Sequence, residues 1–314
     1  MATSSTGSRV AVLARIHNVT DKVISLVEGL AKGSSYDFFV TPNINRGALD
    51  VGAYPAVPHS NAHYNALGFD GHSEYFLMHC ADLLFATVRA QIPGYDHYIV
   101  VEYDVDFVRP AHEFMDRVAQ ALTSQQFRDV DLCGTLLTPR DEWWMWSQNV
   151  APHYPDVWGV FFPFVIMSGR AIDHLLEVRR EERRRTGRTE PSQTAEPDNL
   201  MYCEAFTASA LNAEGSFRLV DLDEMFPGSY QYELFTVGLP RLLGEPVDAD
   251  PAIEIVHPVY GKRDFLERHL ARAAHETDGR AEFQRTLERV SPYIESAMRA
   301  EFEARAAQLP PASS

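Results

Sequence analysis

Hydrophobic residues recur along the chain with two different spacings. Short runs rich in β-branched and aromatic residues predict buried strands, at residues 9–15, 36–40, 98–103, 129–135, 160–167, 217–222 and 253–257. Between them, apolar residues three or four positions apart predict helices, at about residues 20–33, 74–91, 110–122, 168–185 and 198–206. Strands that alternate with helices build a parallel sheet covered by helices. We therefore expect an α/β fold, a single domain with a mostly parallel central sheet flanked by helices.

The remaining stretches have other patterns. Helix starts are expected at the capping residues Thr20, Ser73, Ser168 and Asp198. Residues 43–71 show little periodicity, which predicts a long loop across the strand ends. Residues 263 to about 307 are charged with a helical period, and Pro292 is expected to divide them into two helices.

Two carboxylates follow the most hydrophobic strand of the first half. Tyr98–Tyr103 runs directly into Asp104 and Asp106, with one valine between the two acids. In an extended backbone both would project to the same side, with their Cα atoms roughly 6.5–7 Å apart. The carboxyl end of a strand is where open α/β sheets bind ligands, and a divalent cation would relieve the repulsion between two such acids. The alternative is that the acids only cap the next helix or face solvent.

A single acid, Glu204, lies within the apolar run Leu200–Phe206. Burial of an unpaired carboxyl is costly and raises its pKa. General bases and ligand-binding carboxylates are often presented in this way. The alternative is an acid on the solvent-facing side of its helix.

Two aromatic groups leave their roles open. Trp143, Trp144 and Trp146 crowd one connecting segment, either as a stacking platform for an acceptor or as a hydrophobic plug below the sheet. His59, His63 and His72 lie in or beside the 43–71 loop, where their spacing favours surface histidines over metal ligands.

Composition excludes several classes of protein. The formal net charge of −16 argues against a nucleic-acid or anionic-membrane surface, which would need clustered Lys and Arg. The three cysteines are scattered through apolar runs, as expected of free thiols in a reducing compartment. The longest nearly uncharged apolar run, at 157–167, is too short to span a bilayer, and the N-terminus has no signal-peptide pattern. We expect a cytoplasmic protein without a membrane span.

The order of these features resembles that of GT-A-fold glycosyltransferases. The resemblance covers residues 9–262 and rests on Asp104-Val-Asp106 after a hydrophobic strand, on Ser168-Gly-Arg170 after a second one, on a helix bearing Glu204, and on His257 in a late Val-His-Pro. It implies a nucleotide-sugar-binding half at 9–135 and an acceptor-binding half at 136–262. A C-terminal helical extension at 263–308 would follow.

The resemblance also implies roles for individual residues. Asp106 would bind Mn²⁺ or Mg²⁺, Asp104 would reach the ribose of the sugar nucleotide or the metal shell, and His257 would contact the metal or the diphosphate. Glu204 would be the catalytic base of an inverting enzyme, with Asp198 behind it, whereas a retaining enzyme would need no such base. The expected nucleotide contacts are Ala14, Arg15, His17, Asn18, Asp37 and Thr41.

The expected activity is metal-dependent transfer of a sugar from a nucleotide-diphosphate donor, a UDP-sugar in the first instance, to a hydroxyl of a carbohydrate or small-molecule acceptor. A GT-A-like nucleotidyltransferase is one alternative, although Ala14–Asn18 lacks the Gly-rich, basic loop that such enzymes carry after the first strand. A non-catalytic carbohydrate-binding or scaffold protein is another. The charged C-terminal helices would suit a homodimer interface.

Overall fold

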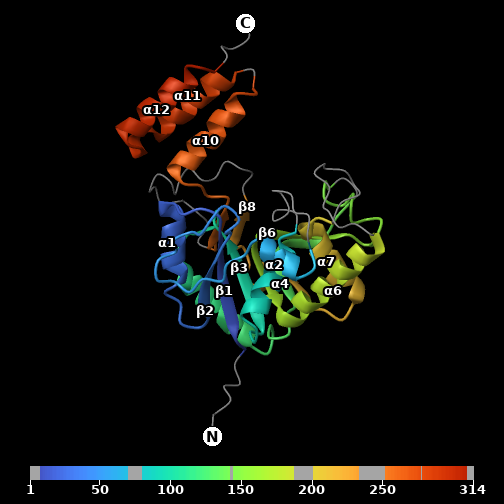
Figure 1. Cartoon of the computed structure of the whole chain (residues 1–314). Helices are drawn as coiled ribbons and strands as arrows, with labels where there is room; N and C mark the ends of the chain where they lie inside the picture. Colours follow the sequence, from blue (N-terminus) through green and yellow to red (C-terminus); the bar gives the residue numbers. More distant parts are fainter. Residues whose placement is uncertain are drawn as a thin grey trace.

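A six-stranded sheet with the order β2-β1-β3-β6-β5-β7 runs through the body of the molecule (Figure 1). The computed structural model describes residues 8–69, 80–141, 144–186, 201–232, 252–276 and 278–309. The strands of this sheet are β1 (Val10–Ile16), β2 (Asp37–Pro42), β3 (His97–Glu102), β5 (Leu132–Pro139), β6 (Trp158–Ser168) and β7 (Leu219–Asp221).

Five of the six strands point the same way. β1 pairs in parallel with β2 and β3, and β5 pairs in parallel with β7. Only β6 is antiparallel to its two neighbours, β3 and β5. The predicted mostly parallel central sheet is therefore confirmed.

Helices cover both faces of the sheet because every central strand is apolar on both sides. Leu13 and Val100 face one core cluster, and Val12 and Val101 face the other. One face is covered by α4 (Asp82–Gln91), α6 (Gly169–Thr186) and α7 (Cys203–Glu214). The other is covered by α1 (Asp21–Leu30), α5 (Ala111–Thr123) and α8 (Leu222–Met225).

Strand β6 carries Pro163 between two partner strands, where its missing N–H would interrupt the ladder. The register between β5 and β6 shifts at this point, from Gly134 opposite Val165 to Thr135 opposite Phe161. Next in β5, Leu136 has a φ of 57°, a left-handed conformation that is rare for a non-glycine residue. The irregularity accommodates the proline inside the sheet.

A second, three-stranded sheet joins distant parts of the chain. It consists of β4 (Asp106–Phe107), β9 (Ile255–His257) and β8 (Tyr230–Tyr232), with β9 in the middle. Of these, only β9 was predicted, because two or three residues are too few to show a strand period.

Two of the predicted helix caps are confirmed. Thr20 Oγ1 accepts a hydrogen bond from the Val23 amide at 3.3 Å, and Ser168 Oγ accepts one from the Ala171 amide at 3.1 Å. Ser73 and Asp198 lie outside the described residues. The 43–71 stretch contains a short helix, α2 (Asn61–Ala66), and Asn43 and His59 form a parallel bridge at the end of β2.

The C-terminal segment forms three helices, so the prediction of two is wrong. They are α10 (Lys262–Ala273), α11 (Gly279–Val290) and α12 (Ser296–Ala306), with a 3₁₀ turn at Ser291–Tyr293. The missed break lies before Gly279, where a Cβ atom would stand 1.8 Å from the Ala273 carbonyl oxygen. These helices enclose their own core, which includes Phe265, Phe283 and Phe302.

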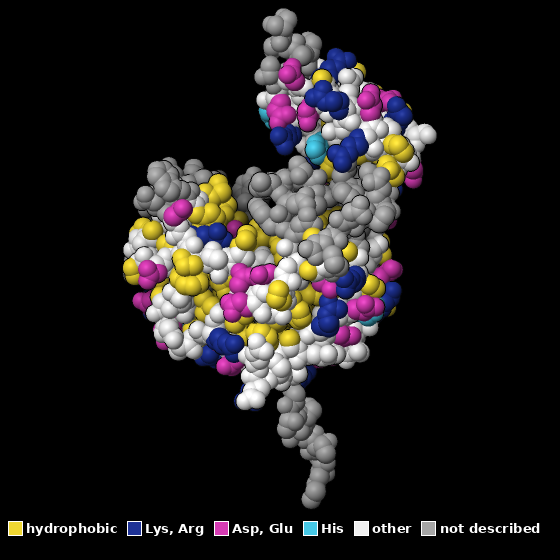
Figure 2. Space-filling view, turned by 180° about the vertical axis from the view of Figure 1, so that it is seen from behind, with side chains coloured by type: hydrophobic (Ala, Val, Ile, Leu, Met, Phe, Trp, Pro, Cys, Tyr) yellow, Lys and Arg dark blue, Asp and Glu magenta, His cyan; other side chains and the backbone are white. Residues whose placement is uncertain are grey.

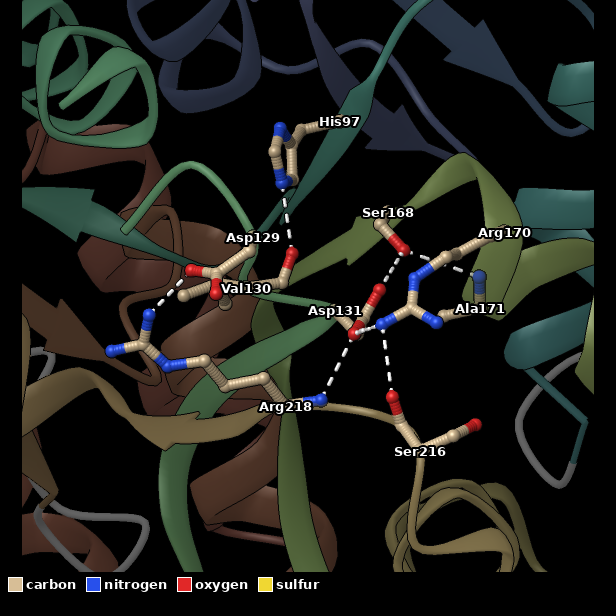
Figure 3. A network of polar contacts seen from close by, with 9 residues as sticks. All are labelled: His97, Asp129, Val130, Asp131, Ser168, Arg170, Ala171, Ser216 and Arg218. Atoms are coloured by element: carbon tan, nitrogen blue, oxygen red, sulfur yellow. Dashed lines mark hydrogen bonds and ion pairs between the residues drawn. The ribbon is translucent and has the colours of Figure 1, made fainter. Parts of the chain in front are cut away.

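At the amino edge of the sheet, Asp131 joins three strands (Figure 3). Its buried carboxylate accepts hydrogen bonds from Ser168 Oγ at 2.6 Å, from the Arg218 amide at 2.9 Å and from Arg170 Nη2. Ser168 ends β6, and Asp131 and Arg218 directly precede β5 and β7. This network satisfies a charge that would otherwise be costly to bury, and it fixes the edge opposite the candidate site.

Among the described residues, no helix combines the length and apolarity needed to cross a bilayer.

Candidate functional site

The chemistry-bearing residues collect where β1, β2 and β3 end. The strand register places Arg15 beside both Thr41 and Glu102 at this carboxyl edge. Arg15 Nη1 lies 2.5 Å from Glu102 Oε1, and both side chains are largely buried. The other polar groups at this edge of the sheet lie around the Arg15–Glu102 ion pair.

Asp104 follows β3 in a turn and is buried, with 7% of its surface exposed. Its Oδ1 lies 3.4 Å from His257 Nε2, and its carbonyl oxygen accepts a hydrogen bond from the Val259 amide at 2.6 Å. Lys22 Nζ donates to the carbonyl oxygens of Tyr103 and Val105 on either side. Burial favours a raised pKa for Asp104, but its contact with His257 and the charge of Lys22 outweigh burial and lower the pKa.

The extended geometry expected for Asp104 and Asp106 is wrong, because residues 103–105 form a turn between two different sheets. Asp106 lies in β4, opposite Val256 of β9, and its Oδ1 accepts a hydrogen bond from the Phe107 amide at 2.8 Å. The same β4–β9 pairing carries His257 to Asp104. The small sheet therefore determines which residues meet at this edge.

Asp104 and His257 fit a divalent cation as a partial ligand set. Asp104 Oδ1 and His257 Nδ1 are buried and have no hydrogen-bond partner. Within the described ranges, no group of three or more His, Cys, Asp or Glu side chains is arranged to hold a metal ion. Mg²⁺ typically keeps several waters and is held by one or two carboxylates together with substrate phosphates. The pair thus suits a cation that arrives with a phosphorylated ligand, not one enclosed by protein alone.

Glu204 occupies the first turn of α7 and is partly buried. Burial raises the pKa of its carboxyl to about 7, and the charge of Glu102 adds to the increase. Hydrogen bonds from the Phe162 backbone and the Trp146 side chain, and the charge of Arg140, oppose it. A carboxyl that titrates near neutrality can accept a proton from a substrate and release it to solvent.

The predicted nucleotide contacts are only partly brought together. His17 packs edge-on against Tyr103, with ring centroids 4.1 Å apart, and the neighbouring Asn18 has a buried Oδ1 without a partner. The Ala14 side chain lies in the core, and its carbonyl oxygen accepts a hydrogen bond from Thr41 Oγ1 at 3.1 Å. Both side chains are therefore committed to the fold.

Asp37 lies elsewhere. It is the first residue of β2, in register with Ala11, and so belongs to the opposite edge of the sheet from Arg15. Its Oδ2 accepts a hydrogen bond from Tyr95 OH at 2.7 Å. Position within the strand decides this outcome, because only residues at the carboxyl end of a parallel strand face the candidate site.

The expectation that His59 lies at the surface is wrong, and its place among the buried polar residues was therefore missed. It is 1% exposed, its Nδ1 lies 3.0 Å from Tyr64 OH, and its Nε2 has no hydrogen-bond partner. Burial lowers its pKa to about 3, with help from the Arg15 charge. Its spacing gave no signal, since the bridge to Asn43 that buries it is a tertiary contact. His72 lies outside the described residues.

The tryptophan segment has both packing and site contacts. Trp146 stacks on Tyr202, with ring centroids 3.6 Å apart and planes 2° from parallel, and Trp144 lies under the Arg140 guanidinium at 5.0 Å. Both tryptophans are partly buried against the core. Trp146 also interacts with the Glu204 carboxyl and lowers its pKa, so this tryptophan belongs to the candidate site as well as to the core. Trp143 lies outside the described residues.

Comparison with known proteins gives likenesses in structure only. No protein-family model and no curated protein sequence matches the chain. Among solved structures, it is similar to a glycosyltransferase involved in glycosylation of the major capsid of PBCV-1, with 10% identity over 79% of this chain and 92% of that chain and a TM-score of 0.40. It is also similar to the apo form of mouse xyloside xylosyltransferase 1, with 10% identity over 80% of this chain and 97% of that chain and a TM-score of 0.43. Likenesses at this level do not identify the reaction of this chain.

Proposed function

We propose that the protein is a glycosyltransferase that moves a sugar from a nucleotide-diphosphate donor to an acceptor hydroxyl, with inversion at the anomeric carbon. One observation carries the proposal: a carboxyl with a pKa of about 7, Glu204, shares an edge of the sheet with the cation-compatible pair Asp104 and His257. Glu102 links the two groups, because it ends β3 two residues before Asp104 and its charge raises the Glu204 pKa. A base and a site for a charged leaving group are what this transfer requires.

In the proposed reaction, Glu204 acts on the acceptor while the donor loses its nucleoside diphosphate. Glu204, as a carboxylate, accepts the proton of the acceptor hydroxyl while that oxygen forms its bond to the anomeric carbon. The bond from the anomeric carbon to the diphosphate oxygen breaks, and its electron pair leaves with the nucleoside diphosphate. Attack from the face opposite the leaving group inverts the configuration.

We assign binding of the nucleotide-sugar donor to the part of this sheet edge that carries Asp104 and His257. Asp104 and His257 would hold Mn²⁺ or Mg²⁺, and the ion would supply positive charge to the departing diphosphate. Arg15, His17 and Asn18 lie at the end of β1, where they would contact the nucleotide. A UDP-sugar is the first donor to test.

Calorimetric titration with UDP, GDP, CDP and dTDP, with Mn²⁺ and then with EDTA, tests the donor site. We expect one nucleotide to bind in a metal-dependent manner and Asp104→Asn to abolish that binding. Asp129→Asn is the matched control, because it makes the same change at an exposed carboxylate on the opposite edge, paired with Arg218. Absence of binding by every nucleotide to folded protein would refute the proposal.

Transfer is tested next with sugar nucleotides that carry the base identified in this way. The anomeric configuration of the product, read from its proton NMR coupling, distinguishes inversion from retention. Metal-dependent nucleotide binding without turnover on a panel of sugar acceptors would favour a non-catalytic binding protein with the same site.

A further inference from the structure

The C-terminal helices α10–α12 lie beyond the end of the sheet opposite the N-terminus (Figure 1). Ion pairs fasten α12 to α10, with Arg263 Nη1 2.8 Å from Glu301 Oε1 and Arg305 Nη1 2.5 Å from Glu267 Oε1. Figure 2 shows basic and acidic side chains interspersed over this part of the molecule. Most of its arginine charge is thus balanced within the helices.

Arg268 is an exception. It follows Glu267 by one residue and therefore points about 100° away around α10 from the face that pairs with α12. Its guanidinium lies over the Tyr260 ring, 4.0 Å from the centroid. Among the described residues it makes no ion pair and no hydrogen bond. Stacking uses the flat face of a guanidinium and leaves the N–H donors at its rim available.

The surroundings of Arg268 belong to the candidate site. Tyr260 lies three residues after His257, in the connection between β9 and α10. The ring of Tyr103, the residue before Asp104, packs against the ring of His17, with the centroids 4.1 Å apart. Burial lowers the pKa of His17, the charges of Arg15 and Arg268 add to the decrease, and the Asp104 charge opposes it. The Arg268 charge therefore reaches the His17 ring, which packs against the residue before Asp104.

The other cations of this edge are already engaged. Arg15 is paired with Glu102, and Lys22 donates to the carbonyl oxygens of Tyr103 and Val105. A diphosphate that enters next to Glu102 and Asp104, in a chain of formal net charge −16, meets strong negative charge. Binding of the diphosphate therefore needs a positively charged side chain in addition to a metal ion.

We propose that Arg268 binds the diphosphate of the nucleotide donor, so that the C-terminal helices form part of the donor site. The inference rests on the proposed function, because it assigns Arg268 to the same diphosphate that Asp104 and His257 would serve. Tyr260 holds the guanidinium plane, and its rim N–H groups donate to phosphate oxygens. Arg268 is thus a binding and positioning residue, and Glu204 remains the proton acceptor.

The test compares three ligands that share one base: the nucleoside diphosphate that binds best, its monophosphate and its nucleoside. With Mn²⁺ present, we expect Arg268→Ala to weaken diphosphate binding about 10- to 100-fold, as for the loss of charge-assisted hydrogen bonds. Nucleoside affinity should change less than about twofold. Arg289→Ala is the matched control, since Arg289 is likewise an exposed arginine of the helical unit without an ion pair among the described residues.

A second variant tests whether weaker binding comes from loss of the charge or from loss of structure. Arg268→Gln keeps a planar polar group over Tyr260 without the charge, and it should weaken diphosphate binding by a similar factor at an unchanged melting temperature. Equal losses for diphosphate and nucleoside, or no loss in either variant, would overturn the role of Arg268. Retained binding by both Arg268 variants together with loss in Asp104→Asn would refute this inference alone. Absence of diphosphate binding by the unmodified protein would overturn the donor site itself and Arg268's role with it.

Discussion

His257 Nε2 lies 3.4 Å from Asp104 Oδ1, although one residue follows the third strand of the chain and the other ends the last. Two hydrogen-bonded connections create this meeting: the pairing of Asp106 with Val256 and the bond from the Val259 amide to the Asp104 carbonyl. Neither connection uses the two side chains themselves. Asp104 and His257 are therefore placed by backbone pairing and are available to a ligand.

We expect His257→Gln to weaken Mn²⁺-dependent nucleotide binding about 10-fold, and Asp104→Asn at least 100-fold. The Asp104 substitution is expected to weaken binding more than the His257 substitution, because a carboxylate contributes charge as well as a ligand atom to a hard divalent cation. Calorimetry with and without EDTA measures both effects. His275→Gln, in the turn after α10, is the control, and metal-dependent binding that survives Asp104→Asn would contradict the assignment.

Transfer activity should rise with pH. Glu204 must be ionised to accept a proton, and its pKa is about 7, so kcat/KM should increase through pH 7 and level off about one unit above it. Glu102→Gln removes a like charge and should move this rise to lower pH. Measurement of kcat/KM from pH 5.5 to 9 tests both statements. If the Glu102→Gln variant shows the same pH profile as the unmodified protein, the ionisation seen in that profile does not belong to Glu204.

Glu204→Gln should abolish transfer yet stabilise the fold at alkaline pH. Folded Glu204 keeps its proton up to about pH 7, whereas the unfolded carboxyl loses it near 4.5, so the folded state binds more protons between these values. Stability conferred by this residue therefore falls as pH rises through that window, by about 3 kcal/mol. Glutamine does not ionise. Urea unfolding at pH 5 and pH 8 should show a larger relative gain for the variant at pH 8 than at pH 5.

Arg179→Met should destabilise the protein by about 3–5 kcal/mol. Arg179 is fully buried, donates from Nε and Nη2 to Asp82 at 2.9 Å each, and lies 3.7 Å from the Phe206 ring centroid. Its loss leaves the buried Asp82 charge without its partner. The exposed pair Arg285–Glu282 offers the control, since Arg285→Ala should cost about 1 kcal/mol or less. Chemical denaturation compares the two, and equal effects would show that Arg179 does not hold α4, α6 and α7 together.

The α/β class and most strands of the central sheet follow from local sequence patterns. Strand periods depend on which side chains are apolar, so the runs at 9–15 and 98–103 identified β1 and β3 to within a residue or two. The caps at Thr20 and Ser168 were readable because capping is a contact between residues three positions apart. Asp104 stood out because it directly follows an apolar strand, Glu204 because it lies within an apolar run, and His257 only through the family resemblance.

Contacts between distant segments determine which of these residues meet. They bring Asp104 to His257, place Glu204 where the Glu102 charge raises its pKa, bury His59, and put Asp37 at the opposite edge of the sheet. They also leave Arg268 as a cation without a carboxylate partner among the described residues. Each outcome depends on strand register, on a sheet of two- and three-residue strands, or on a contact between distant segments. Local sequence patterns do not contain that information, because they report which residues prefer burial and not which partner lies across the interface.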